Sequence, residues 1–358
     1  MVLKEERSCY DEFASLGWNR LPENPCERVD RLMLNRIKHW VNLFLRLSVM
    51  IASKCTAALL RPSGAETTVR DVFAKHGYYL LPKHYDLPIP DELDMTGDFY
   101  ERGSGLVGVD MNDKDALALL ENLFPRYVQE FRSLIPTHRT NNPKQFYLLN
   151  GAYMAIDSHV YYAFIRHFNP KKIIEIGAGY STLLAACAGA QNLKEKGSSP
   201  RLIAVDPYPN ELIKEGFPGL SQLIESKVQD VPLDLFTSLE RGDILFIDSS
   251  HILRSGGDVQ MEYLEILPRL SSGVIVHIHD VSLPRAYPRI YFETQHYWNE
   301  QYLLQSFLAF NSRFKVLWPG NYMMIQYPEK VCKVFPEFYA MRQSFPMSEP
   351  TAFWMGVR

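Results

Sequence analysis

From about residue 150 onward, the apolar positions fall into short continuous runs separated by stretches with helical periodicity. Runs that are apolar throughout predict strands buried on both faces of a parallel sheet. The expected strands cover residues 172–176, 202–205, 224–228, 243–247, 273–279, 314–318 and 352–357. The expected helices cover residues 156–168, 181–191, 257–267 and 299–310. This alternation predicts an α/β fold with helices on both faces of the sheet.

Before residue 150 the periodicity is helical and interrupted. Residues 1–30 show no regular pattern. One helical stretch is expected after them, ending near Leu60, and two further helices are expected over residues 67–76 and 113–135. Arg61-Pro62-Ser63-Gly64 predicts a break, and Leu80–Pro90 an extended proline-rich segment. We therefore expect three parts: an N-terminal extension with an apolar helix (1–62), a helical and proline-rich lid region (63–150) and an α/β domain (151–358).

The apolar helix over residues 37–60 has several interpretations. Residues 40–60 are long enough to span a bilayer. Arg46 and Lys54 fall inside this stretch, however, and a charge at the centre of a span costs roughly 2.5–3.5 kcal/mol on insertion scales. Three alternatives stay open: a helix docked on the protein or on a second subunit, as in a homodimer, which we favour; a helix lying in a membrane interface; and a true span.

Net charge, cysteine spacing and the N-terminal residues indicate which partners and which cellular compartment to expect. The 358 residues carry a formal net charge of −3, so no global basic field would attract nucleic acid. The five cysteines are scattered without a C-x-x-C pair, which argues against a disulfide framework and for a reducing compartment. The polar N-terminal residues do not resemble a cleavable signal peptide. We expect a cytoplasmic protein, with any membrane association arising from residues 37–60.

Polar side chains follow the ends of four predicted strands. They are Glu175, Asp206, Asp248 with His251, and His279 with Asp280. In open α/β sheets, ligands bind outside the carboxyl ends of the strands. The recurrence of acids and histidines there predicts a binding site at this edge of the sheet.

A Gly-x-Gly turn follows the first strand of the domain. Gly177 and Gly179 remove the Cβ atoms that would keep a cofactor from the backbone. Thr182 replaces the third glycine of the dinucleotide fingerprint, and no Gly-Lys-Ser/Thr phosphate loop occurs. Glu175 before the turn and Asp206 after the next strand suit a cofactor with ribose hydroxyls, a positive charge and no phosphate. S-adenosylmethionine fits this description, with Asp206 accepting from both ribose hydroxyls.

The chain from about residue 150 to its end resembles class I S-adenosylmethionine-dependent methyltransferases, and among them the methyltransferase domain 24 group. The stretches that carry this resemblance are Glu175–Thr182, Phe246–His251, Ser255–Asp258, Val276–Asp280, Trp298–Gln305 and Phe353-Trp354. The resemblance implies a Rossmann-like, doubly wound, seven-stranded sheet of order 3-2-1-4-5-7-6 with the last strand antiparallel.

The same resemblance implies a set of cofactor contacts. Glu175, Gly177 and Gly179 would line the methionine end, Asp206 would bind ribose, and Asp230 occupies the adenine-contact position. Ser181 would contact the carboxylate end of the cofactor or cap the following helix, and Asp248 would lie beside the cofactor.

Two chemistries for the acceptor stay open. Related O-methyltransferases acting on catechols and antibiotic sugars hold a divalent ion after strands 4 and 5, where this chain has Asp248 and Asp280, with His279 as a further ligand. Mg²⁺ prefers oxygen ligands, whereas a mixed set suits a transition metal better. Alternatively, His251 or His279 beside Asp248 acts as a metal-free base, because the imidazole pKa suits proton removal.

Several of these residues also have purely structural interpretations. His277 is expected to be a hydrogen-bonded core residue, and Asp243 a structural one. Asp258 is expected to be a helix N-cap, whereas His251 could serve only to cap a turn. Trp298, Tyr302 and Phe307 have helical spacing and belong either to the core or to an acceptor pocket.

The function we predict is S-adenosylmethionine-dependent O-methylation of a small-molecule or biosynthetic intermediate. N-methylation is the nearest alternative. From other classes, the alternatives are a non-catalytic cofactor-binding or scaffold protein and a nicotinamide oxidoreductase. The sequence does not identify the acceptor.

Overall fold

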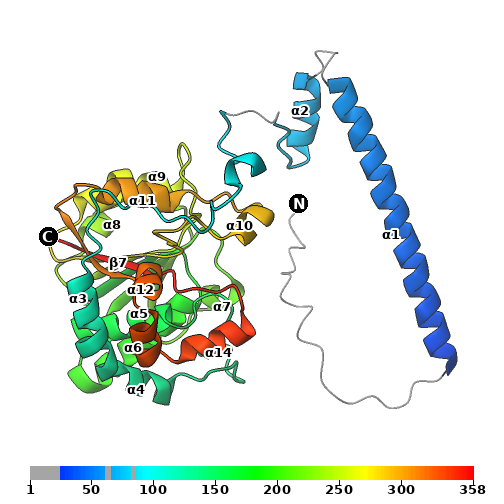
Figure 1. Ribbon diagram of the computed structural model, residues 1–358. Coiled ribbons are helices and arrows are strands. Elements are labelled where there is room, and N and C mark those ends of the chain that lie inside the picture. Colours follow the sequence, from blue (N-terminus) through cyan, green and yellow to red (C-terminus); the bar gives the residue numbers. More distant parts are fainter. Residues whose placement is uncertain (1–24, 61–65, 82–85) are drawn as a thin grey trace. The chain divides into compact units, whose positions relative to one another are not determined.

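The computed structural model describes residues 25–60, 66–81 and 86–358. Two compact units, Met1–Leu87 and Pro88–Arg358, make up the chain. The first contains α1 (Pro25–Leu60) and α2 (Glu66–Lys75), the blue helices of Figure 1. Helix α1 begins at Pro25, inside the segment expected to be irregular, because proline is tolerated in the first turn of a helix. The predicted break at residues 61–64 lies outside the described residues.

Among the described residues, none of the helices, including α1, combines the length and the apolar character needed to cross a bilayer.

The second unit is built on a seven-stranded sheet of the predicted order, β3-β2-β1-β4-β5-β7-β6. Its strands are β1 (Lys172–Ile176), β2 (Arg201–Val205), β3 (Leu220–Ile224), β4 (Ile244–Ile247), β5 (Ile275–Ile278), β6 (Phe314–Pro319) and β7 (Phe353–Val357). Strands β1 to β5 pair in parallel, and β7 pairs antiparallel with both β5 and β6. The predicted fold class is therefore confirmed.

One strand lies elsewhere than predicted. The sequence pattern placed the third strand at residues 224–228, whereas β3 covers Leu220–Ile224. This strand is at the edge of the sheet, and its Ser221 and Gln222 are exposed. An edge strand carries a weaker apolar signal than a buried central strand, so its position was not evident from hydrophobicity.

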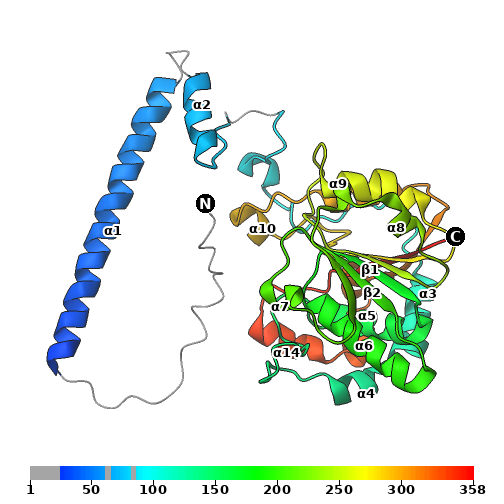
Figure 2. The same ribbon diagram turned by 180° about the vertical axis from the view of Figure 1, so that it is seen from behind.

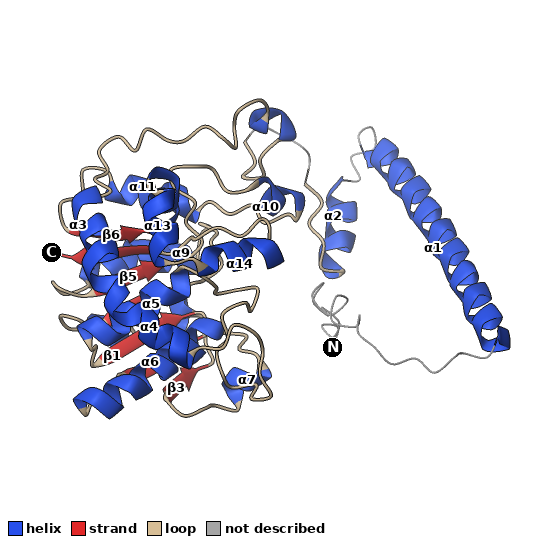
Figure 3. Ribbon diagram, turned by 60° about the horizontal axis from the view of Figure 1, so that its bottom comes forward, coloured by secondary structure: helices blue, strands red, loops and turns tan. Residues whose placement is uncertain are grey.

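Helices cover both faces of the sheet (Figures 2 and 3), and alternate residues of each strand face different cores. Ile173 belongs to a cluster with α4, α5 and α6, whereas Ile174 belongs to a cluster with residues of α9 and α11. The longer helices before β4 are α4 (Phe124–Leu134), α5 (Asp157–Phe168) and α6 (Tyr180–Lys196). The shorter ones there are α3 (Asp113–Ala118), α7 (Glu211–Lys214) and α8 (Leu233–Thr237), with a π-helical turn at Leu119–Leu123.

Between β4 and β6 lie α9 (Asp258–Met261), continued by π and 3-10 turns to Arg269, then α10 (Arg289–Glu293) and α11 (Glu300–Leu308). Three helices separate β6 from β7, where the sequence pattern predicted none: α12 (Gly320–Gln326), α13 (Pro328–Val334) and α14 (Glu337–Ser344). With only seven or eight residues each, they are too short for helical periodicity to show clearly.

Residues 88–150 belong to the same compact unit as the sheet. Their packing includes Leu120, Phe124 and Phe131, which are buried in the same core as Ile173. A lid role for residues 63–150 stays a prediction.

Candidate active site

A cleft of about 510 Å³ lies beyond the carboxyl ends of β1, β2, β4 and β5. Its lining comes from the turn after β1, the ends of the neighbouring strands and the loop before α5. The lining residues are Gly151, Ala152, Tyr153, Gly177, Ala178, Gly179, Tyr180, Ser181, Asp206, Asn210, Asp248, His279, Asp280 and Tyr291. The strand-end rule thus predicted the position of the cleft.

The glycine turn packs tightly against β4. Gly177 has φ +90°, and a Cβ atom on it would lie 2.0 Å from the main-chain oxygen of Asp248. The Gly177 N–H donates to the carbonyl of Val205, which ties the turn to β2. Thr182, which stands where a third glycine was considered, accepts a hydrogen bond from the Gly179 N–H at 3.0 Å. Threonine therefore closes the turn at this position.

Asp206 is held at the side of the cleft next to the turn. Its Oδ2 accepts from the Ala178 N–H at 3.0 Å, and its Oδ1 accepts from the Tyr208 N–H at 2.7 Å. A carboxylate has about four lone-pair sites, so both oxygens keep capacity to accept from a ligand. This geometry is compatible with the predicted ribose contact.

The structure brings some of the predicted cofactor residues to the cleft and places others outside its lining. Gly177, Gly179, Ser181, Asp206 and Asp248 line it. In contrast, Glu175 is fully buried and accepts from the Tyr161 hydroxyl at 2.8 Å, and burial raises its pKa to about 7. Asp230 is exposed at the end of a short 3-10 turn. Contacts of Glu175 and Asp230 with a cofactor stay predictions.

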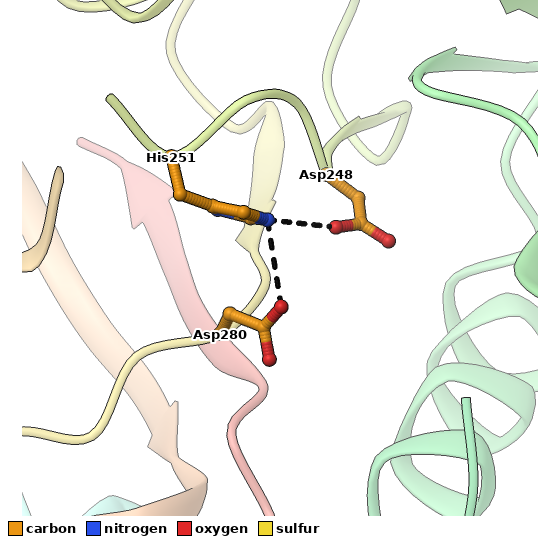
Figure 4. Close-up of side chains that lie close together, drawn as sticks. All are labelled: Asp248, His251 and Asp280. Carbon is orange, nitrogen blue, oxygen red and sulfur yellow. Dashed lines mark ion pairs between the residues drawn. The ribbon is translucent and has the colours of Figure 1, made fainter. Parts of the chain in front are cut away.

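His251 lies between two carboxylates and is backed by a third. Its Nε2 is 3.3 Å from Oδ1 of Asp248 and 3.4 Å from Oδ2 of Asp280, as Figure 4 shows. On the other side of the ring, Nδ1 is 2.9 Å from Oε2 of Glu300, a buried residue at the start of α11. His251 and Asp280 both have positive φ, 58° and 55°. Such strained backbone tends to occur at functional sites.

The charges around His251 decide its protonation. Burial alone would lower the imidazole pKa, but hydrogen bonds with Asp248 and Glu300 and the charge of Asp280 outweigh burial and raise the pKa well above its usual value. Burial would likewise raise the pKa of Asp248, but the charge of His279 and hydrogen bonds with both histidines hold it below its usual range.

His279 faces the cleft directly. Its Nδ1 lies 3.5 Å from Oδ1 of Asp248, and its Nε2 lies 3.7 Å from Oδ2 of Asp157. Burial opposes the charged form, but the charges of Asp280 and Asp248 are stronger and raise the His279 pKa well above its usual value. Both histidines therefore belong to one buried network of carboxylates.

Comparisons with known proteins agree with this site. Residues 174–281 match the family model of a methyltransferase domain, and this span contains the glycine turn together with Asp248, His251 and Asp280. A protein of Archaeoglobus fulgidus with no assigned function is 32% identical over 175 residues, which cover 47% of this chain and 77% of that protein. The chain belongs to the class I S-adenosylmethionine-dependent methyltransferases.

Solved structures of methyltransferases superpose on this one at low TM-scores. A Podospora anserina methyltransferase bound to S-adenosylhomocysteine has a TM-score of 0.33 and 20% identity, and the match covers 60% of this chain and 94% of that one. A TDP-rhamnose 3'-O-methyltransferase of calicheamicin biosynthesis has a TM-score of 0.33 and 13% identity, and the match covers 54% of this chain and 86% of that one. A Bacillus cereus O-methyltransferase has a TM-score of 0.29 and 15% identity, and the match covers 68% of this chain and 96% of that one. The assignment rests on the family match and not on these superpositions.

The cluster of this methyltransferase has a donor set that suits a divalent cation. Asp248, His251 and Asp280 each place one possible ligand atom so that all three lie within 4.8 Å of one another. Histidine ligands of metals usually donate their other ring N–H to a carboxylate, and Glu300 stands at that position. The sequence prediction had His279 in this set, whereas the group in the structure contains His251. These residues fit a transition metal better than Mg²⁺ because one donor is nitrogen.

Two residues of the network were not predicted from the sequence. Glu300 lies in the Trp298–Gln305 stretch that carried the family resemblance, so its position was a usable signal. Asp157 starts α5 and accepts from the Thr351 N–H at 2.9 Å. It was not singled out because an acid in the first turn of a helix is common.

The structural interpretations mostly hold. Asp243 accepts from three main-chain N–H groups, as expected of a structural residue. The expectation that Asp258 is a helix N-cap was wrong: Gly257 is the N-cap of α9, and Asp258, at the first helical position, accepts from the N–H and hydroxyl of Ser250. Phe307 packs on the core, whereas the Trp298 ring lies against His251, tilted by 50° with ring centroids 4.4 Å apart.

His277 corrects one expectation. It is a core residue beside Phe246 and Trp354, but neither ring nitrogen has a hydrogen-bond partner among the described residues. Aromatic rings surround it on this face of the sheet and offer few acceptors, and burial lowers its pKa well below the usual value.

Proposed function

We propose that this methyltransferase transfers the methyl group of S-adenosylmethionine to a hydroxyl oxygen of a small molecule. One observation carries the proposal: the glycine turn and the side chains of Asp248, His279 and Asp280 line the same cleft. Groups able to take a proton therefore lie beside the expected position of the methyl donor. Enzymes in which the acceptor must lose a proton need this proximity.

The transfer is an in-line displacement at the methyl carbon. The C–S bond breaks as the C–O bond forms, the electron pair stays on sulfur, and the hydroxyl proton goes to the protein. Of the two histidines, His279 is the better placed to take that proton because it lines the cleft, whereas His251 is not among the lining residues and its Nδ1 is engaged by Glu300. Because Asp280 and Asp248 raise the pKa of His279 well above its usual value, it would take the hydroxyl proton only in its neutral form, after releasing its own proton to solvent. Asp157 and Asp248, on either side of His279, would orient its ring.

The carboxylates also support metal assistance. Asp248, His251 and Asp280 would hold a divalent cation, and such an ion would polarise an acceptor oxygen and favour its deprotonated form. Glu300 would then orient the His251 ring for coordination. The acceptor most compatible with this arrangement has a hydroxyl group with a second oxygen next to it.

The experiment combines binding, metal content and transfer. Native mass spectrometry of the purified full chain should detect bound S-adenosylmethionine or S-adenosylhomocysteine, and elemental analysis should report any stoichiometric metal. Release of S-adenosylhomocysteine is then measured with a panel of phenols, vicinal diols, sugars and amines. His279→Gln should lower kcat by about 10²- to 10⁴-fold while the Kd for S-adenosylhomocysteine changes less than about threefold.

Asp258→Asn is a matched control because Asp258, at the first position of α9, is an acid outside the cleft lining. It should leave kcat nearly unchanged. Transfer to amines alone would contradict O-methylation and favour N-methylation. Cofactor binding without transfer to any acceptor of the panel, and a biological role that survives Asp248→Ala and His279→Ala, would favour a non-catalytic protein. Full activity in metal-free protein would remove the metal from the mechanism.

A further inference from the structure

Helix α1 exposes large apolar side chains over its described length. Side-chain surroundings are described for residues 38–56, and nearly all of these residues are exposed. Trp40 is 67% exposed and Phe44 is 70% exposed, and seven further large apolar side chains up to Ile51 are also in contact with solvent. Exposed apolar area on this scale marks a surface that binds something.

The exposed side chains form two distinct faces. At about 100° per residue, the spacing i, i+3, i+4, i+7 places one set of apolar residues on one side of the helix. We call this set the apolar face: Trp40, Leu43, Phe44, Leu47, Met50 and Ile51. A narrower strip beside it carries His39, Asn42, Arg46 and Ser53, which we call the polar face. Val49 lies at the edge of this strip, and Val41 and Leu45 extend the exposed apolar surface around the remaining side. The helix therefore combines a wide apolar surface with a narrow polar strip.

The charge of this segment has a single sign. Between Asp30 and Glu66 there is no acidic residue, and the basic ones are Arg31, Arg36, Lys38, Arg46, Lys54 and Arg61. A second copy of the helix would bring an equally basic stretch alongside, and its only carboxylates, Glu27 and Asp30, lie in its first two turns, away from most of these charges. A surface of anionic lipid headgroups complements these charges, and hydrocarbon beneath the headgroups accommodates the apolar face.

We propose that α1 lies in the interface of an anionic membrane and attaches the methyltransferase to it. The apolar face enters the boundary between headgroups and acyl chains, and Arg46 on the polar face remains in the aqueous headgroup layer. Lys54 lies toward the apolar side, and its long aliphatic stem lets the ammonium reach the headgroups. Bilayer attachment of this kind needs no span, in agreement with the length and hydropathy of the described helices.

The test is cosedimentation of the full chain with lipid vesicles. Vesicles of pure phosphatidylcholine are compared with vesicles containing about one third phosphatidylserine, at low and at 1 M salt. The chain should bind the phosphatidylserine vesicles, and high salt should weaken binding because surface charges are screened. Arg46→Gln with Lys54→Gln should reduce partitioning by about fivefold for each charge.

Polar substitutions on the apolar face test whether this face enters the boundary between headgroups and acyl chains. Phe44→Ser with Leu47→Ser should reduce partitioning more than tenfold, whereas the matched polar-face pair Asn42→Ser with Ser53→Ala should not change it. Unchanged binding of S-adenosylhomocysteine would show that the catalytic unit is intact in every variant. No sedimentation with either vesicle would overturn the proposal, as would a dimer seen by analytical ultracentrifugation without lipid that Phe44→Ser with Leu47→Ser abolishes.

Discussion

Replacement of each glycine of the turn by alanine should have a different effect: loss of stability at Gly177 and loss of cofactor affinity at Gly179. At Gly177 the new Cβ would lie 2.0 Å from the main-chain oxygen of Asp248, so the turn and β4 would have to separate by about 1 Å. No side-chain rotation relieves this contact because both atoms belong to, or are fixed by, the backbone. The Asp248 N–H also donates to the carbonyl of Ile176 at 2.9 Å, which ties the two strands together.

The loss in free energy of unfolding expected for Gly177→Ala has two contributions. A non-glycine residue with positive φ costs about 1–2 kcal/mol, and overpacking in a rigid site costs about 1–3 kcal/mol or more. Gly177→Ala should therefore lower the free energy of unfolding by about 2–5 kcal/mol. At about 2–4 °C per kcal/mol for a unit of this size, Tm should fall by roughly 4–20 °C.

Gly179→Ala is the matched control. Gly179 has an extended φ of −172°, and its Cβ would meet no atom within 4 Å, but the residue lines the cleft. Its Tm should stay within about 2 °C of the parent, while the added methyl group occupies cofactor space and raises the Kd for S-adenosylhomocysteine at least about tenfold. Thermal unfolding and isothermal titration calorimetry measure both. A parental Tm for Gly177→Ala, or equal loss of Tm in both variants, would refute this reasoning.

Three more predictions concern groups outside the His251 cluster. Asp206→Ala should weaken S-adenosylhomocysteine binding by about 10- to 100-fold, measured by calorimetry, because ribose hydroxyls lose a charged acceptor. Asp243→Ala should cost about 2–4 kcal/mol in urea unfolding, because three main-chain N–H groups lose their acceptor. Burial of His159 lowers its pKa from 6.5 to about 4, so the folded state binds this proton less readily than the unfolded state. Stability should therefore be full above pH 6.5 and fall by up to about 3 kcal/mol as pH drops from 6.5 to 4, a loss that His159→Phe removes.

Each of these has an outcome that would contradict it. Unchanged affinity in Asp206→Ala would mean that ribose binds elsewhere. An Asp243→Ala variant as stable as the parent would mean that water replaces the carboxylate at no cost. If His159→Phe and the parent lose stability equally between pH 6.5 and 4, other groups must account for the acid sensitivity.

Much of the catalytic unit was predictable because buried parallel strands are apolar throughout and end at polar residues. Asp248, His279 and Asp280 were expected at one edge of the sheet, and all three line the cleft. Edge strand β3 was misplaced because its exposed positions weaken the apolar signal. The helices between β6 and β7 were missed because each is too short to show a period.

The partners of the cluster were harder to foresee. Glu300 and Asp157 contact His251 and His279 across separations of 49 and more than 100 residues. No local pattern encodes such pairs, because an acid at a helix start usually has a purely local role.

Local chemistry along the chain was enough to predict most of the strands, the glycine turn and the edge of the sheet at which the cleft lies. Hydrophobic periodicity and backbone requirements are local properties, and the family resemblance added the order of the strands. Folding alone decided which histidine meets which carboxylate. His251 places its Nε2 near Asp248 and Asp280 while Glu300 engages its Nδ1, and the Nδ1 of His279 approaches the same two carboxylates at 3.5 and 3.6 Å. Those contacts depend on elements that come together only in the packed structure.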